Sequence, residues 1–135
     1  MSARLLVNVD VGDLDRATAF YTAAFGLAVG RRFGPHGVEL LGADSAIYLL
    51  AKPAGSMGAG GQARRYERHW TPVHLDFVVD DLELALARAE AAGAVREGPP
   101  SEHAWGKLAL LADPFGHGIC LVRFLGEGYD AIATE

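Results

Sequence analysis

Residues 72–82 decide the fold, and they read Pro-Val-His-Leu-Asp-Phe-Val-Val-Asp-Asp-Leu. From Val73 to Val79 apolar side chains alternate with mostly polar ones, the period-two pattern of a β-strand with two unlike faces. An apolar pattern with helical spacing begins directly afterwards over residues 82–92, and Asp81 is suited to cap that helix. The stretch therefore predicts a strand that runs straight into a helix.

The same arrangement occurs near the start of the chain. Residues 5–14 read Leu-Leu-Val-Asn-Val-Asp-Val-Gly-Asp-Leu, and Asp81 lies 68 residues after the corresponding aspartate, Asp13. An apolar stripe with helical spacing follows over residues 14–25, and Gly26 is suited to end that helix in a left-handed conformation. The repeat predicts one structural unit that is used twice.

Each copy is predicted to have the element order β-α-β-β-β. Strands are expected over residues 4–11, 27–33, 38–41 and 46–50 in the first copy, and over 73–79, 94–96, 107–112 and 118–124 in the second. Residues 98–101 are expected to form a loop, and residues 113–117 a tight turn. The prediction is one domain over residues 1–135, with module one at 4–52, a glycine-rich linker at 53–71, module two at 72–125 and a tail at 126–135.

Composition restricts the partners and the location of the protein. The chain has 135 residues and a net charge of −5, so it is large enough for a core and shows no basic patch for nucleic acid. Its one basic cluster, residues 64–68, is expected to be a solvated loop. There is no apolar run that would cross a membrane and no signal-peptide layout. A single cysteine, Cys120, cannot form an internal disulfide, so we expect a cytoplasmic protein.

The motifs of both copies resemble the vicinal oxygen chelate superfamily, which includes glyoxalase I, extradiol dioxygenases, fosfomycin resistance proteins and bleomycin resistance proteins. The resemblance lies in residues 11–27, residues 73–82 and the Asp-Pro-Phe-Gly-His turn at 113–117, which is similar to the family's Asp-Pro-x-Gly-Asn turn. It implies an α+β fold in which two tandem β-α-β-β-β modules form a cup-shaped mixed sheet with the helices outside and a site inside. It also implies a homodimer.

The two faces of each first strand predict where a site lies. One face is apolar in both copies and is expected to pack against the helix of its own module. The other face is mixed, with Leu6, Asn8 and Asp10 in the first copy and His74, Asp76 and Val78 in the second. These side chains either meet solvent or line a ligand-binding cleft, and the duplication favours the cleft.

The resemblance assigns metal-ligand positions to the first and last strand of each module. Carried onto this chain, the four positions are Leu6, Tyr48, His74 and Cys120. Leucine has no donor atom, and only His74 is a common ligand type, whereas a divalent metal needs several converging imidazole and carboxylate groups. We therefore expect no metal and no cofactor. The alternative is zinc held by histidine and cysteine with other donors such as Asp76, His103 or a partner chain.

Six residues are predicted to bind a ligand: Asn8, Tyr48, His74, Asp76, Trp105 and Cys120. The histidine is read as a hydrogen-bonding group or base, the asparagine and aspartate as anchors for a polar ligand, and the two aromatic residues as walls of the cleft. Cysteine is either a small core residue or a thiolate activated by His74. Glu39 and Glu102 have no fixed partner that would mark an acid/base pair.

Three functions compete at this stage. The first is metal-independent binding of a small molecule, similar to the bleomycin resistance proteins, with no nucleic acid or membrane as a partner; the acidic charge suits a cationic or amphipathic ligand. The second is a metal-dependent lyase or dioxygenase of the same superfamily with atypical ligands. The third is a module that only associates with other proteins, which an exposed apolar sheet face would favour.

Overall fold

The structure, a computed structural model, describes residues 2–134 and divides into two compact units, Met1–Glu67 and Arg68–Glu135. Met1 and Glu135, the ends of the predicted domain, lie outside the described residues. Each unit is described by itself. The predicted boundaries of the modules, linker and tail stay a prediction.

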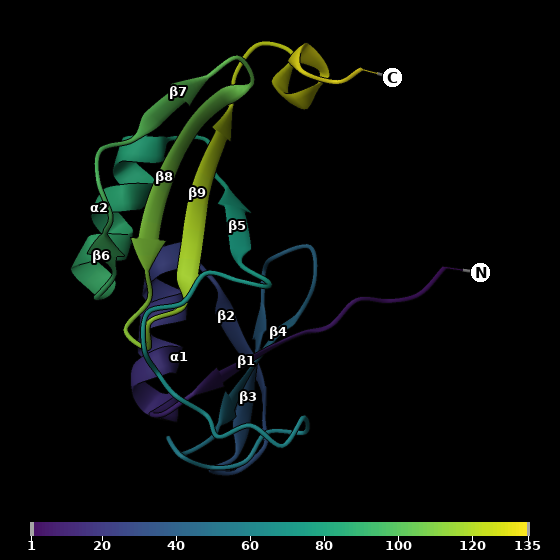
Figure 1. The fold of residues 1–135 in the computed structure, drawn as a ribbon, viewed down its shortest axis with the longest axis vertical. Coiled ribbons are helices and arrows are strands. Elements are labelled where there is room, and N and C mark those ends of the chain that lie inside the picture. The colour runs from purple at the N-terminus through teal and green to yellow at the C-terminus, as the bar shows by residue number, and fades with distance from the viewer. Residues whose placement is uncertain (1, 135) are drawn as a thin grey trace. The chain divides into compact units, whose positions relative to one another are not determined.

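The first unit has the predicted order β-α-β-β-β. Its elements are β1 (Val7–Val11), α1 (Leu14–Phe25), β2 (Ala28–Arg32), β3 (Gly37–Leu41) and β4 (Ile47–Ala51). The strands form a mixed sheet in the order β1-β4-β3-β2, in which β1 and β4 are parallel (Figure 1).

The second unit repeats this plan with one additional strand. Its elements are β5 (Leu75–Val78), α2 (Leu82–Ala92), β6 (Val95–Arg96), β7 (Ser101–His103), β8 (Gly106–Ala112), β9 (Gly118–Phe124) and a 3-10 helix, η1 (Gly128–Ala131). The sheet order is β5-β9-β8-β6, with β7 paired to β8. The predicted α+β class and the repeated unit are confirmed. The prediction of a loop over residues 98–101 was wrong for residue 101, which begins the strand Ser101–His103. This strand pairs with β8 although all three of its residues are exposed.

Both helices begin and end as their sequences predict. A side-chain oxygen of Asp13 accepts a hydrogen bond from the backbone N–H of Arg16 at 3.0 Å, and Asp81 accepts one from Leu84 at 3.0 Å. These contacts satisfy N–H groups that have no partner within the helix. Gly26 ends α1 in the left-handed conformation, with φ of 65°.

Each helix covers one face of the sheet in its own unit. In the first unit α1 lies against β2, β3 and β4, and in the second α2 lies against β6, β8 and β9 (Figure 1). The buried side chains of these layers include Phe20, Tyr21, Leu40 and Leu49 in the first unit and Leu86, Leu111, Ile119 and Leu121 in the second. The uncovered faces leave large apolar side chains exposed, such as Leu41 and Val78.

Arg64, in the segment before residue 68, holds that segment against the first unit by hydrogen bonds. Arg64 donates from Nε to Asp10 Oδ2 at 2.7 Å and from Nη1 to the carbonyl of Met57 at 2.7 Å. The expectation of a solvated basic loop was therefore wrong for this residue, because its charge is paired and mostly buried.

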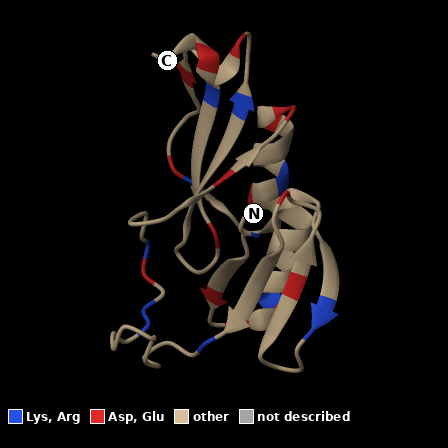
Figure 2. Cartoon of the chain, turned by 90° about the vertical axis from the view of Figure 1, so that its right-hand side faces the viewer, with Lys and Arg blue, Asp and Glu red and all other residues tan. Residues whose placement is uncertain are grey.

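In both units Lys and Arg are interspersed with Asp and Glu (Figure 2). Within residues 2–134 we find no helix with the length and apolar character that crossing a membrane requires.

The two caps give a test of the repeated unit. We expect Asp13→Ala and Asp81→Ala each to lower the free energy of unfolding by about 1 kcal/mol, because each removes the acceptor for an unpaired helical N–H. Urea unfolding followed by circular dichroism measures this loss. Asp80→Ala is the matched control beside Asp81, and it should change stability by less than about 0.5 kcal/mol. Equal losses in Asp80→Ala and Asp81→Ala would contradict the assignment of the cap.

Candidate functional site

The uncovered face of the second sheet brings three of the predicted residues together. Parallel pairing places Asp76 in β5 opposite Cys120 in β9, and His74 lies on the same face two residues before Asp76. His74 Nε2 is 3.2 Å from Asp76 Oδ1. The ligand atoms of all three side chains lie within 4.8 Å of one another. We name these residues the His74 cluster.

An aromatic ring that sequence reasoning missed covers the imidazole of this cluster. Trp70 stacks on His74 with ring centroids 3.9 Å apart and an angle of 17° between the planes. The indole fits because β9 begins with glycine: a Cβ at Gly118 would lie 2.3 Å from Trp70 Cε3. The available signals were a tryptophan four residues before His74 and a glycine at the start of a buried strand. Trp70 holds the imidazole in one orientation on the sheet face.

Cys120 is buried, with 3% of its surface exposed, and its thiol is not activated. Burial, the negative charge of Asp76 and a hydrogen bond to that carboxylate together raise the pKa of Cys120 to about 12. The hypothesis of a thiolate activated by His74 is therefore wrong, because burial and the Asp76 carboxylate both raise the pKa of the thiol. Cys120 behaves as the small buried residue that was the alternative prediction.

The uncovered face of the first sheet carries a second cluster, formed by Arg31, Glu39 and Tyr48. Arg31 donates from Nη2 to Glu39 Oε2 at 2.7 Å, and the Tyr48 hydroxyl donates to the same oxygen at 2.8 Å. Arg31 Nη2 also lies 3.2 Å from the Tyr48 oxygen. Glu39 thus has two fixed partners that the sequence did not predict, although they form an ion pair and not an acid/base pair. These bonds to the charged form lower the pKa of Glu39 to about 2, with Arg31 as the main cause.

A bulge in β2 makes this cluster, which we name the Glu39 cluster. The register between β2 and β3 shifts after Val29, so that the backbone N–H of Arg31 donates to Glu39 Oε1 at 3.0 Å. Gly30 leaves room for that carboxylate, since a Cβ there would lie 2.6 Å from Oε1. A bulge commonly redirects a side chain in this way. The Glu39 side chain is only 8% exposed, whereas that of Arg31 is 69% exposed.

Two aromatic rings border the Glu39 cluster. The ring of Phe33 lies 6.2 Å from that of Tyr48, and the Arg31 guanidinium lies 5.8 Å from the Phe33 centroid. Asn8 is exposed and pairs with Tyr48 across β1 and β4. Tyr48 and Asn8 therefore lie side by side on a polar and aromatic surface, and their role in binding a ligand stays a prediction. Glu102 lies on the surface of the second unit, 3.7 Å from the Lys107 amine.

Trp105 is not part of the His74 cluster within the second unit. It lies between β7 and β8, stacks on His103 at 4.8 Å and packs against Phe124 and Tyr129. Phe124 is four residues beyond Cys120 along β9, a separation of about 13 Å in a strand. His103, named as an alternative zinc donor, lies at the same end. The structure therefore places Trp105 and His103 apart from the other second-unit candidates.

The donor set fits a metal ion poorly at the positions that the family uses. A cysteine must lose its proton to bind a metal, and burial beside Asp76 opposes that loss. The Tyr48 hydroxyl is engaged by Glu39 and Arg31, and Leu6 has no donor. The convergence of His74, Asp76 and Cys120 is the one feature in favour of an ion among the described residues. Absence of a metal stays a prediction.

Comparison with known proteins gives a family and a fold. The sequence pattern of the glyoxalase-like domain matches residues 6–122. The anthracycline biosynthesis protein DnrV of Streptomyces peucetius is 31% identical over an alignment of 116 residues that covers 80% of this chain and 41% of that protein. The chain thus spans less than half the length of this relative.

Solved structures share the fold at low sequence identity. The hypothetical protein SA1046 from S. aureus aligns with a TM-score of 0.73 and 19% identity, covering 91% of this chain and 95% of that one. The fosfomycin resistance protein FosX from Listeria monocytogenes aligns with a TM-score of 0.71 and 20% identity, covering 94% and 97%.

Replacing Gly30 tests the construction of the Glu39 cluster. We expect Gly30→Ala to lower the free energy of unfolding by about 1–3 kcal/mol, because the added methyl group overlaps the carboxylate of Glu39 and must displace it. Urea unfolding measures the change. Gly60→Ala is the control, since a Cβ there meets nothing within 4 Å. If the two variants were equally stable, Gly30 would not be needed to seat the carboxylate.

Proposed function

The chain belongs to the glyoxalase-like domain family of the vicinal oxygen chelate superfamily, and from this premise we propose that it binds a small molecule without a metal ion. The binding surfaces are the sheet faces that α1 and α2 leave uncovered. On these faces lie the predicted residues Asn8, Tyr48, His74, Asp76 and Cys120.

The observation that carries this proposal is the mutual pairing of the polar groups. The carboxylate of Asp76 is engaged by His74 and by the Cys120 thiol, and the carboxylate of Glu39 by Arg31 and Tyr48. An entering cation would have to displace these partners or remove a proton from a thiol whose pKa is about 12. An organic ligand needs neither step, because exposed edges and ring faces remain for hydrogen bonds and stacking.

The exposed groups favour a flat compound with hydrogen-bonding substituents. The first unit offers the rings of Phe33 and Tyr48 beside the exposed Arg31 guanidinium, and the second offers Trp70 stacked on His74. Aromatic rings of this kind stack on planar ligands, and guanidinium N–H groups donate to ligand oxygens. The name of the Streptomyces relative, an anthracycline biosynthesis protein, agrees with an aromatic ligand, and that of FosX with a resistance function.

We further propose a cytoplasmic homodimer that has neither nucleic acid nor membrane as a partner. The net charge of −5 and the single buried cysteine support this assignment. The exposed apolar side chains of Leu41, Val78 and Leu110 would favour association with another protein chain, and the family resemblance implies a second copy as that chain.

A metal-dependent lyase or dioxygenase is the second candidate. The observation that favours it is the spacing of the His74 cluster, in which imidazole, carboxylate and thiol atoms lie within 4.8 Å of one another. Cysteine and histidine are zinc ligands, and a bound ion would lower the pKa of the thiol. This candidate requires one bound ion per chain in the purified protein.

A thermal-shift experiment on chelator-treated protein tests the proposal. An anthracycline, bleomycin and fosfomycin serve as probes, since a ligand that binds only the native state raises the melting temperature. We expect one of them to raise the melting temperature by at least about 2 °C, and His74→Ala or Tyr48→Ala to reduce this shift. Asp44→Asn, an exposed loop variant, is the control that should keep the full shift.

Metal analysis decides between the two candidates. Stoichiometric zinc, nickel or iron in protein purified without chelator, lost in His74→Ala, would contradict metal-independent binding and favour the enzyme. Metal-free protein in which none of the three probes shifts the melting temperature would contradict the proposed ligand class.

A further inference from the structure

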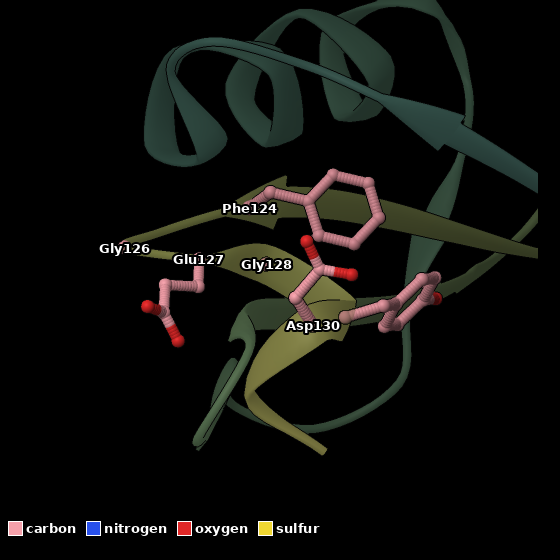
Figure 3. A pocket seen from close by; sticks show the side chains of 6 residues that line it. Phe124, Gly126, Glu127, Gly128 and Asp130 are labelled. Carbon is pink, nitrogen blue, oxygen red and sulfur yellow. The ribbon is translucent and has the colours of Figure 1, made fainter. Parts of the chain in front are cut away.

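A hollow of about 400 Å³ lies at the C-terminal end of the second unit, apart from the His74 cluster. It is lined by Phe124, Gly126, Glu127, Gly128, Tyr129 and Asp130 (Figure 3). Two glycines build it: Gly126 and Gly128 have φ of 60° and 58°, a conformation that other residues rarely adopt. They turn the chain so that η1 folds back against the end of β9.

Aromatic rings form the apolar side of this hollow. The ring of Tyr129 lies 4.6 Å from that of Phe124 and 5.4 Å from that of Trp105, both in edge-to-face geometry. This contact fixes the rings while leaving much of their surface in solvent, with Tyr129 51% and Phe124 37% exposed. The faces of such rings carry partial negative charge.

A carboxylate completes the hollow. Figure 3 shows the side chain of Asp130 directed toward the ring of Phe124, whereas Glu127 points away from it. Within residues 2–134 the structure shows neither carboxylate in an ion pair or side-chain hydrogen bond. The neighbouring cation Arg123 precedes Phe124 in β9, so its side chain starts on the opposite face of the strand.

We propose that this hollow binds a small organic ammonium ion. An ammonium group seated on the rings of Phe124 and Tyr129 gains the cation–π attraction, and Asp130 supplies the opposite charge at the same point. A neutral compound of equal shape gains only the apolar contact, and an anion is repelled by Asp130. The overall charge of −5 also favours a cation. The residues of this hollow differ from those of the proposed function, since Phe124 is four residues beyond Cys120 along β9.

Choline and 3,3-dimethylbutan-1-ol form the pair of probes, because they share a shape and differ in charge. Titration into isotope-labelled protein is followed by the amide resonances of Gly126, Gly128 and Tyr129. We expect choline to shift these resonances saturably and the neutral alcohol to bind at least about fivefold more weakly. Equal affinities for the two probes, or no saturable shift by choline, would overturn the proposal.

Two variants of neighbouring carboxylates, one a test and one its control, examine the role of Asp130. Asp130→Asn should weaken choline binding at least about fivefold, whereas Glu127→Gln should change it by less than about twofold, because Glu127 points away from the ring. Unchanged affinity in Asp130→Asn would contradict the site, and the amide spectrum of each variant reports whether it is folded. His74→Ala should leave choline affinity unchanged, so that failure of this site and failure of the proposed function are separate results.

Discussion

The parallel pairing of the first and last strand in each unit is the constraint on which the site depends. Parallel neighbours require a crossover, and here the crossover contains the helix that buries one sheet face. The same pairing places Asn8 beside Tyr48 and Asp76 beside Cys120, at equivalent points of the two sheets. The fold thus produces two uncovered sheet faces, and each carries polar side chains where its first and last strands pair.

The two units use this place differently. The first holds an ion pair between Arg31 and the buried carboxylate of Glu39. The bulge in β2 and the absence of a side chain at Gly30 leave room for this carboxylate next to Arg31. The second holds an imidazole, a carboxylate and a thiol whose pKa is raised by burial and by the adjacent carboxylate. In both, polar groups satisfy one another, and in the first unit the Arg31 guanidinium and the Phe33 ring remain exposed. That arrangement is suited to an organic ligand more than to an ion.

Local patterns predicted most of the fold, because capping and alternation act over a few residues. The helix over residues 82–92 and its cap at Asp81 are confirmed to the residue. The strand Ser101–His103 escaped prediction because its exposed residues carry no apolar signal. The partners of Glu39 also escaped prediction, since they depend on a register shift between strands that no single stretch encodes.

The ionisation of Cys120 tests the central claim most directly, because a neutral thiol beside Asp76 is what disfavours a metal ion. The ultraviolet absorbance of the thiolate, taken as the difference from Cys120→Ala, measures it as the pH is raised. The structure predicts no thiolate up to about pH 10, since the pKa of Cys120 is about 12. Half-ionisation near the ordinary value of about 8.5 would contradict this account.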